Sequence, residues 1–561
     1  MTSYIKLFMK TVLQLFTKHS AFLVVVFLAL FSVSSLFHSG LPPTHDGEYH
    51  VIRFYEFDKT LRDGNFYPIW ASDLNFRFGV PLFPYVYPLP NYMASLFHLF
   101  SFSFIDAFKL NLIVASIIGA ITSYFLGKQK YGKWGGVLTS VFYTYAPYHF
   151  LDIYIRGSVG EVWALALFPL PLFFLHRLLI KKTLLDTVFL GVSLASIIFA
   201  HNILSLMFFA FFASYAVLLI LLSKRKKEIT LRVTSGFIIA FLLSCVFFVP
   251  ALLEREYVVG LSTFNVYENF PELFELVIPS WGSGFSGEGI ANQMSFQIGL
   301  ANLVVIFLVI LAFVLKKIKK EKLQIGFFLA WFFILFFLVT PHSSFIWRTV
   351  PLMEYFQFPW RLLSLVIFVC AILSGSLVSM YKKNALYVGL IIFSVVITLQ
   401  YSHAPYFFDR TDSHYTTRAN FIYGTNSIGN AFQTKWLPLQ TKLPGTHAFI
   451  KKGKGQVQVL SNRTTLSSYA VNMDTSGSLL INTAYFPEWK AYENGREIIL
   501  KNTDGKLEIP LSEGKHTVQV ELKDTFIRSF TKLVSVVTVL VILVFLIRLA
   551  VIQLSYERRN R

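Results

Sequence analysis

The sequence predicts a polytopic α-helical membrane protein with one β-rich domain near its C-terminus. Two observations lead to this fold class. Hydrophobic residues make up 55% of the 561 residues and charged residues only 14%, and the mean hydropathy is +0.57. Because soluble domains carry roughly 25% charged residues, this chain has too few of them to cover a water-facing surface of its size. In addition, the apolar residues gather in long runs, and only residues 403–525 have the composition of a sizeable soluble domain.

Twelve apolar runs are long enough to cross a bilayer as helices of ~17–25 residues. They lie at residues 21–37, 108–126, 135–151, 159–179, 184–200, 203–222, 233–251, 296–315, 324–340, 360–381, 385–402 and 530–552. The segment 84–100 is also apolar, but Pro84, Pro88 and Pro90 interrupt it, so we expect it to re-enter or to lie on the membrane surface. If this segment crossed instead, the chain would have thirteen spans and its C-terminus would lie outside.

The basic residues of the short loops fall on one side of this topology. They comprise Lys128/Lys130/Lys133, Arg177/Lys181/Lys182, Lys224/Arg225/Lys226/Lys227, Lys316/Lys317/Lys319/Lys320/Lys322, Lys382/Lys383 and Arg558/Arg559/Arg561. The positive-inside rule then places both termini in the cytoplasm of a multi-pass protein of the cytoplasmic membrane, with outer loops at 38–83, 252–293 and 341–359. The formal net charge of +19 forms no continuous basic face, which argues against a nucleic-acid partner.

The region 403–525 shows the period-two alternation of β-strands. Alternating runs occur at 456–460, 479–485, 497–500 and 516–522, with the turn dipeptides Asn494-Gly495, Asp504-Gly505 and Glu513-Gly514 between them. This pattern predicts antiparallel strands in hairpins, arranged as a small sandwich. The predicted organisation is a membrane domain over 1–402, an extracytoplasmic β domain over 403–525, and a last helix with a basic cytoplasmic tail over 526–561.

The first candidate for chemistry follows the first helix, in the stretch Thr44–His50. It holds Asp46 and Glu48, separated by a glycine, together with His45 and His50 at the outer membrane boundary. The two carboxylates could accept a proton or hold a cation. The alternative is a solvated loop, or a helix start in which Asp46 is the N-cap and Glu48 lies in the first turn. Residues 48–63, which begin within this stretch, are predicted to form an amphipathic helix on the membrane surface.

A second candidate lies between two spans on the same outer side. Asp152 and Arg156 precede Glu161, which begins an otherwise apolar helix. An ionisable group at that depth is costly and commonly marks a cavity or a functional pair. The alternative is that Glu161 pairs with Arg156 and caps its helix.

The third candidate is the segment Gln357-Phe358-Pro359-Trp360-Arg361, which opens another helix from the outside. Arg361 near a helix N-terminus could bind a phosphate, whereas Trp and Arg at a membrane boundary are also ordinary interfacial anchors. If the three candidates form one site, Asp46, Glu161 and Arg361 should converge in the structure. The sequence contains no phosphate-binding glycine-rich loop, no zinc-type His/Cys spacing and no Gly-x-Ser-x-Gly motif.

Several short motifs carry a resemblance to a known family. They are His45-Asp46-Gly47 with His50 and Arg53, Tyr154-Ile155-Arg156-Gly157-Ser158 with Glu161, Ser295-Phe296-Gln297-Ile298-Gly299, Gln357-Phe358-Pro359-Trp360-Arg361-Leu362, and Tyr485-Phe486-Pro487-Glu488-Trp489. Through them the chain resembles the membrane proteins called 6-pyruvoyl-tetrahydropterin-synthase-related, which are similar to YfhO-type proteins and to the GT-C glycosyltransferase superfamily. The family name implies no pterin chemistry here. At Lys435-Trp436-Leu437-Pro438 related proteins often have Glu-Tyr-Leu-Pro, so an acid at that point has no counterpart in this chain.

The resemblance implies a GT-C-like architecture and a polyprenyl-phosphate-linked sugar as donor. It implies that Asp46 acts as a base or metal ligand, with Glu48 as the neighbouring candidate. Substrate contacts are then expected from His45, His50, Arg53, Arg156, Glu161, Gln357, Trp360 and Arg361. The resemblance assigns no definite cofactor, and a divalent cation is compatible with the carboxylates. The expected partners are the lipid-linked sugar and membrane lipid.

Three functions are consistent with these residues. The first is glycosyl transfer at the outer face of the cytoplasmic membrane, with a lipid phosphate as leaving group. The second is a transporter or flippase for a lipid-linked or polymeric envelope substrate, for which Gly/Pro-interrupted helices in two matching halves would be the marker; the sequence has no clear internal repeat. The third is a non-catalytic scaffold for envelope assembly that uses the β domain as its binding module.

Overall fold

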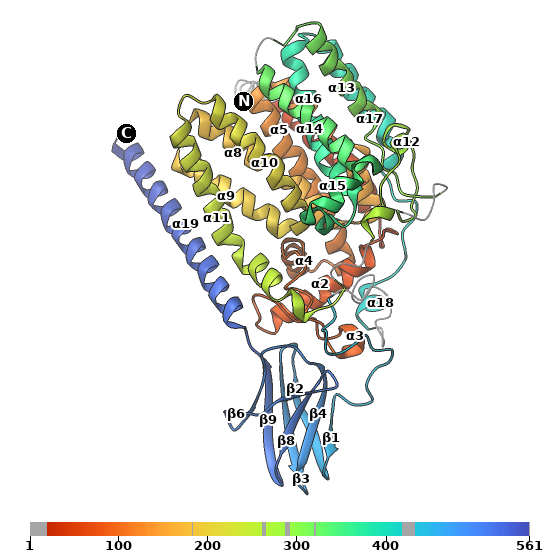
Figure 1. The fold of residues 1–561 in the computed structure, drawn as a ribbon, viewed down its shortest axis with the longest axis vertical. Coiled ribbons are helices and arrows are strands. Elements are labelled where there is room, and N and C mark those ends of the chain that lie inside the picture. Colours follow the sequence, from red (N-terminus) through yellow and green to blue (C-terminus); the bar gives the residue numbers. More distant parts are fainter. Residues whose placement is uncertain are drawn as a thin grey trace, which may run out of the picture. The chain divides into compact units, whose positions relative to one another are not determined.

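The computed structural model describes residues 19–559 except 182, 261–264, 287–291, 319–320 and 418–431, and describes side chains up to residue 552. Figure 1 shows the chain coloured along its sequence. It forms two compact units: the first takes in residues up to Gly47, Lys109–Phe237 and Phe264–Asp409, and the second Glu48–Phe108, Ile238–Thr263 and the residues from Arg410 onward. The side chains of the predicted basic C-terminal tail lie outside the described residues.

The chain is mostly helical, as the composition predicts. Within the described residues, eight helices are long and apolar enough to cross a membrane: Phe104–Thr144 (α5), Val159–Ile180 (α7 and α8), Asn202–Leu222 (α10), Lys226–Leu253 (α11), Lys322–Val339 (α14), Pro359–Met380 (a 3-10 turn followed by α16, Leu363–Met380), Asn384–Tyr401 (α17, Asn384–Thr398, with a 3-10 turn) and Phe526–Ile552 (within α19, Phe526–Arg559). Three shorter apolar helices are His19–Ser32, Leu184–Ala200 (α9) and Leu300–Val314 (α13).

Helix α5 contains the predicted span 108–126 and most of the span 135–151. Gly132 within it has φ 73° and ψ −168°, a conformation that turns the chain and that favours glycine. The arms on either side run antiparallel, since the Ser140 hydroxyl donates to the Ala120 carbonyl at 2.8 Å. Close packing of the arms uses a small residue, because a Cβ on Gly127 would lie 2.4 Å from the Thr139 hydroxyl. With α5 divided in this way, each of the twelve predicted runs lies on helical structure.

The proline-interrupted segment 84–100 forms a short helix in the second unit, Leu89–Leu99 (α4). Its 11 residues extend about 16 Å at 1.5 Å per residue, against about 30 Å for the hydrocarbon core. A helix of this length does not cross a bilayer, in agreement with the prediction. The same unit contains Gly47–Arg62 (α2), where the sequence predicts an amphipathic helix.

The predicted antiparallel β domain is confirmed. Its nine strands are β1 (Ala448–Lys452), β2 (Gly455–Asn462), β3 (Leu466–Met473), β4 (Gly477–Ala484), β5 (Trp489–Glu493), β6 (Arg496–Ile498), β7 (Lys501–Thr503), β8 (Lys506–Leu511) and β9 (Gly514–Leu522). They form a four-stranded sheet in the order β1-β4-β8-β7 and a five-stranded sheet in the order β2-β3-β9-β5-β6. Side chains from both sheets share one core, among them Tyr469, Leu479, Leu507 and Val518, all fully buried.

Two of the three predicted hairpin turns are hairpins. Asn494-Gly495 joins β5 to β6 and Asp504-Gly505 joins β7 to β8, and all four residues have positive φ, as tight two-residue hairpins require. The turn at Glu513-Gly514 is different, because it connects β8 of one sheet to β9 of the other. The prediction of a hairpin there was wrong: a turn dipeptide identifies a chain reversal but does not determine whether the two strands pair.

Candidate functional site: a buried charged cluster

Four charged side chains of the first unit meet in the interior: Asp152, Arg156, Glu161 and Arg361, here called the charged cluster. A π-helical turn, Leu151–Arg156, carries the first two residues and ends at Gly157, which has φ 64°. This left-handed residue ends the turn, and α7 (Val159–Leu167) begins directly afterwards with Glu161 in its first turn. Arg361 comes from the 3-10 turn Pro359–Leu362 before α16.

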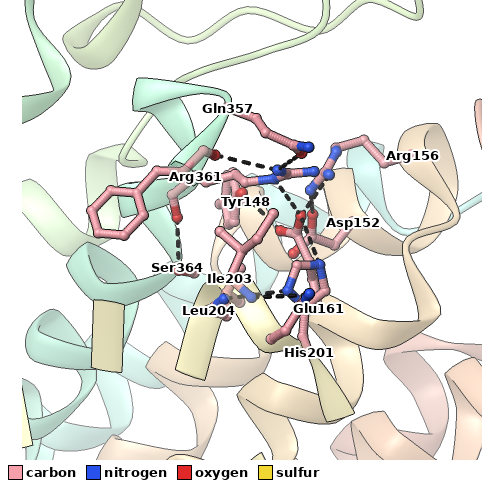
Figure 2. Close-up of polar contacts among 12 residues, drawn as sticks. Tyr148, Asp152, Arg156, Glu161, His201, Ile203, Leu204, Gln357, Arg361 and Ser364 are labelled. Atoms are coloured by element: carbon pink, nitrogen blue, oxygen red, sulfur yellow. Dashed lines mark hydrogen bonds and ion pairs between the residues drawn. The ribbon is translucent and has the colours of Figure 1, made fainter. Parts of the chain in front are cut away.

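Glu161 is the centre of the charged cluster (Figure 2). One oxygen, Oε1, accepts from Arg156 Nη2 at 2.6 Å and from Arg361 Nε at 3.0 Å, although the two arginines are far apart in sequence. The other oxygen accepts from the Tyr148 hydroxyl at 3.2 Å. Arg156 also donates from Nη1 to Asp152 Oδ1 at 2.5 Å. The predicted pairing of Glu161 with Arg156 is therefore present, and Arg361 joins it.

Neutral side chains surround the charged cluster. Gln357 Oε1 accepts from Arg361 Nη1 at 2.5 Å, and the carbonyl of Phe356 accepts from the same nitrogen at 3.3 Å. The ring of Trp360 lies 4.6 Å from the Arg156 guanidinium carbon, which is a cation–π distance. The structure thus brings together five of the predicted substrate-binding residues: Arg156, Glu161, Gln357, Trp360 and Arg361.

The charged cluster is sealed from water. Asp152 and Glu161 are 0% exposed, Arg156 4% and Arg361 9%. Burial and the neighbouring Glu161 carboxylate raise the pKa of Asp152 well above its usual range, although Arg156 opposes the change. Within the charged cluster, two guanidinium groups meet two carboxylates: Arg156 contacts both Asp152 and Glu161, and Arg361 contacts Glu161. One oxygen of Asp152, Oδ2, is buried without a hydrogen-bond partner among the described residues.

His201 lies beside Glu161 at the boundary between α9 and α10. Its Nδ1 accepts from the Leu204 N–H at 3.2 Å, and its Nε2 is 3.9 Å from Glu161 Oε1. Burial lowers the pKa of His201 to about 3, so the ring is neutral and carries its proton on Nε2, facing the carboxylate. Sequence reasoning did not assign His201 or Tyr148. An ionisable residue between two apolar runs at the predicted outer side is the signal that could have identified His201.

The loop with Asp46 lies against the charged cluster through its backbone. The Asp46 N–H donates to the Arg156 carbonyl and the His45 N–H donates to the Ile155 carbonyl, each at 2.9 Å. The ring of His45 contacts the Ser283 carbonyl at 2.8 Å and stacks on Phe285. Asp46 itself is half-buried, and its carboxylate has no hydrogen-bond or ion-pair partner among the described residues.

The remaining predicted residues belong to the second unit. Glu48 pairs with Arg410 at 2.6 Å, a partner that sequence reasoning did not identify. His50 is 2% exposed, with its ring stacked on Phe54 and on Phe108. Arg53 lies over the ring of Tyr49 at 5.9 Å. Within the part of the chain that is described, no group of three or more His, Cys, Asp or Glu residues is placed to hold a metal ion.

The family of the chain is settled by its sequence over most of the membrane region. The family model described as "6-pyruvoyl-tetrahydropterin synthase related domain; membrane protein" matches residues 83–406. This match covers more than half of the chain. The chain belongs to this family of membrane proteins. All four residues of the charged cluster, Asp152, Arg156, Glu161 and Arg361, lie within the family domain, and Asp46 precedes it. No curated protein matches the chain.

Several solved structures share part of the fold. The arabinofuranosyltransferase AftD from Mycobacteria aligns over 69% of this chain at 16% identity and a TM-score of 0.44, and this chain spans 27% of its length. ArnT from Cupriavidus metallidurans bound to undecaprenyl phosphate aligns over 68% of this chain at 14% identity and a TM-score of 0.45, and this chain spans 63% of its length. The apo oligosaccharyltransferase of Archaeoglobus fulgidus aligns over 69% of this chain at 15% identity and a TM-score of 0.37, and this chain spans 57% of its length. At these TM-scores the likeness carries no conclusion about activity.

Proposed function

We propose that this family member is a membrane glycosyltransferase, which moves a sugar from a polyprenyl-phosphate donor to an acceptor at the outer face of the cytoplasmic membrane. The observation that carries the proposal is the position of Asp46. Its carboxylate is half-buried and unpaired among the described residues, and its backbone is hydrogen-bonded to Arg156 of the charged cluster. A carboxylate that could act as a base therefore adjoins two guanidinium groups, which is the combination that this reaction needs.

The base acts on the acceptor. Asp46 would remove the proton from an acceptor hydroxyl while the oxygen of that hydroxyl attacks the anomeric carbon of the donor sugar. Glu48 is the weaker candidate, since its carboxylate is held by Arg410. A divalent cation at this position would take Asp46 as its protein ligand, with the donor phosphate and water supplying further oxygens, as Mg²⁺ sites commonly do.

The positive charge acts on the leaving group. As the bond between the anomeric carbon and the phosphate oxygen breaks, negative charge grows on the polyprenyl phosphate. Glu161 accepts from both Arg156 and Arg361 and is itself held by the Tyr148 hydroxyl, and Gln357 also accepts from Arg361. The charge of the two arginines is therefore oriented before the reaction begins. This arrangement supports transfer more than transport, because charges held in fixed positions can orient one phosphate group but do not accompany a substrate across the membrane.

Replacement of Asp46 tests the proposal. We expect Asp46→Asn, in purified protein reconstituted with labelled polyprenyl-phosphate sugars, to lower transfer by at least about 100-fold, the usual contribution of a general base. Asp474→Asn, in an exposed turn of the β domain, is the matched control and should transfer like the parent. Equal transfer by Asp46→Asn and the control would refute the assignment. Flux of a lipid-linked substrate across proteoliposomes, without any transfer product, would instead identify a transporter.

A further inference from the structure

The β domain carries a groove that has no part in the charged cluster. The groove has a volume of about 330 Å³, near the lower end of the range for ligand sites. It is bordered by the loop 440–446, by strands β1 and β4, and by the start of β8. Its lining includes Phe78, Gln440, Lys442, Phe449, Asn482 and Lys506. All of these residues belong to the second unit.

Strand geometry places side chains in the groove. Phe449 is on the edge strand β1, paired with Leu480 of β4, and points away from the core that receives Ala448; its exposed fraction is 39%. Asn482 follows on β4 and donates from Nδ2 to the Thr446 carbonyl at 2.7 Å, which fixes the loop. Lys506 opens β8 directly after the tight turn at Asp504-Gly505.

An unusual backbone segment leads into Phe78, which lines the groove. Three consecutive non-glycine residues before Phe78, namely Asn75, Phe76 and Arg77, have φ of 51°, 57° and 66°. Such conformations persist only where the surroundings enforce them, and they concentrate at functional sites. Here the Asn75 side chain accepts from the Gln440 N–H at 2.8 Å, and the Phe78 carbonyl accepts from the Ala484 N–H at 2.6 Å.

The charge of the groove has one sign. Lys442 and Lys506 both line it, and neither has an ion-pair partner among the described residues. Of the described residues that line it, none is acidic. Lys451 of the same domain, by contrast, is neutralised by Glu508 at 3.1 Å. Two unneutralised lysines facing one concave surface attract anions.

The neutral lining groups suit a sugar. Gln440 offers an amide group and Thr446 a hydroxyl group for hydrogen bonds to sugar hydroxyls. The exposed ring of Phe449 presents a face with negative partial charge, against which the C–H groups of a sugar ring can pack. We propose that the groove binds an anionic oligosaccharide, with carboxylate or phosphate groups facing the two lysines. This inference rests on the proposed function in that the bound saccharide would be the acceptor or the growing product.

Direct binding to the intact protein tests the inference separately from transfer. The protein in nanodiscs is titrated calorimetrically with tetragalacturonate, with the neutral tetrasaccharide maltotetraose, with inorganic phosphate, and with dihexanoyl-phosphatidylglycerol below its micelle concentration. The variants are Lys442→Ala/Lys506→Ala and the control Lys515→Ala, an exposed lysine on β9 outside the groove. Thermal melting of each variant verifies that the β domain stays folded.

We expect tetragalacturonate to bind at least tenfold more tightly than maltotetraose and phosphate. The double variant should lose at least tenfold in affinity, whereas the control should bind like the parent. Equal affinity for the neutral sugar, unchanged binding by the double variant, or tighter binding of the phospholipid would each overturn the inference. Comparison of the parent with Asp46→Asn separates the two proposals: if both bind tetragalacturonate normally while neither transfers sugar, or while both transfer it equally, the groove stands and the proposed function fails.

Discussion

At the scale of single residues, Glu161 holds the charged cluster together. It is the acceptor that Arg156 and Arg361 share, and it also accepts from Tyr148. Separating a buried ion pair by removing one partner leaves an uncompensated charge in a medium of low polarity. The same carboxylate is therefore important for folding and, in the proposed reaction, for the orientation of both arginines.

Substitution of Glu161 should show this shared role. Glu161→Gln leaves two buried guanidinium groups with Asp152 as their only carboxylate, and we expect it to destabilise the protein by about 3–5 kcal/mol. Arg361→Gln should cost less, because Glu161 keeps Arg156. In the double variant the loss should be clearly smaller than the sum, since both charges of the contact are then absent. Thermal melting in detergent measures all three variants.

An exposed ion pair provides the control for this comparison. Lys490 and Glu497 lie 3.2 Å apart on the β domain, and the Glu497 side chain is 56% exposed. Exposed pairs contribute about 0–1 kcal/mol, so Glu497→Gln should scarcely change the melting temperature. If Glu161→Gln melts like Glu497→Gln, or if the double variant shows simple additivity, the charged cluster is not the coupled unit described above.

The sequence predicted part of this site because charge in an apolar setting is conspicuous. Arg156, Glu161 and Arg361 stand next to long apolar runs, and their convergence was expected from a shared outer side. The sequence could not show that Glu161 is the common acceptor or that Glu48 pairs with Arg410, because such contacts depend on the packing of helices far apart in the chain. The pairing of Glu48 with Arg410 is what makes Asp46, and not Glu48, the carboxylate without a partner among the described residues.

At the scale of elements, the turns of the β domain were predictable and the strand order was not. Asn494-Gly495 and Asp504-Gly505 have sequences that determine local backbone conformation. The order of strands within each sheet depends instead on which faces can share one core. Glycine is needed in both turns, but the surroundings of the two glycines differ.

This difference gives a matched pair of variants. Gly495 and Gly505 have nearly equal φ, 78° and 77°, so alanine at either position should cost about 1–2 kcal/mol for a left-handed backbone. A Cβ on Gly495 would meet nothing within 4 Å, whereas one on Gly505 would lie 2.3 Å from the Trp436 carbonyl oxygen. We therefore expect Gly505→Ala to be the more destabilising variant. Hydrogen exchange of the β strands in the full chain measures the difference, and equal protection in both variants would contradict it.

At the scale of the whole molecule, the predicted loops of each side come together within the first unit. The charged cluster unites residues from predicted outer ends of helices. Elsewhere in this unit Lys130 bonds Gln324 and lies 3.3 Å from the Tyr215 hydroxyl, while Lys133 contacts Ser20 at 3.0 Å, and all of these lie near predicted inner ends. The division of the loops into two groups by their basic residues therefore agrees with the packing of the helices. The positions of Lys and Arg in the sequence identify the two groups of loops, because short loops rich in these residues stay on the cytoplasmic side when the chain inserts into the membrane.

Which group faces the cytoplasm can be tested with single cysteines. The native Cys245 and Cys370 are both buried, so they give little background with a membrane-impermeant maleimide. Lys224→Cys, in the basic loop between α10 and α11, should be labelled only after intact cells are permeabilised, because positive loops are retained inside. Lys515→Cys on β9 should be labelled in intact cells, since the β domain is proposed to be extracytoplasmic. The reverse labelling would invert the topology and would place Asp46 and the charged cluster on the cytoplasmic side, where the proposed use of an outward-facing lipid-linked donor is excluded.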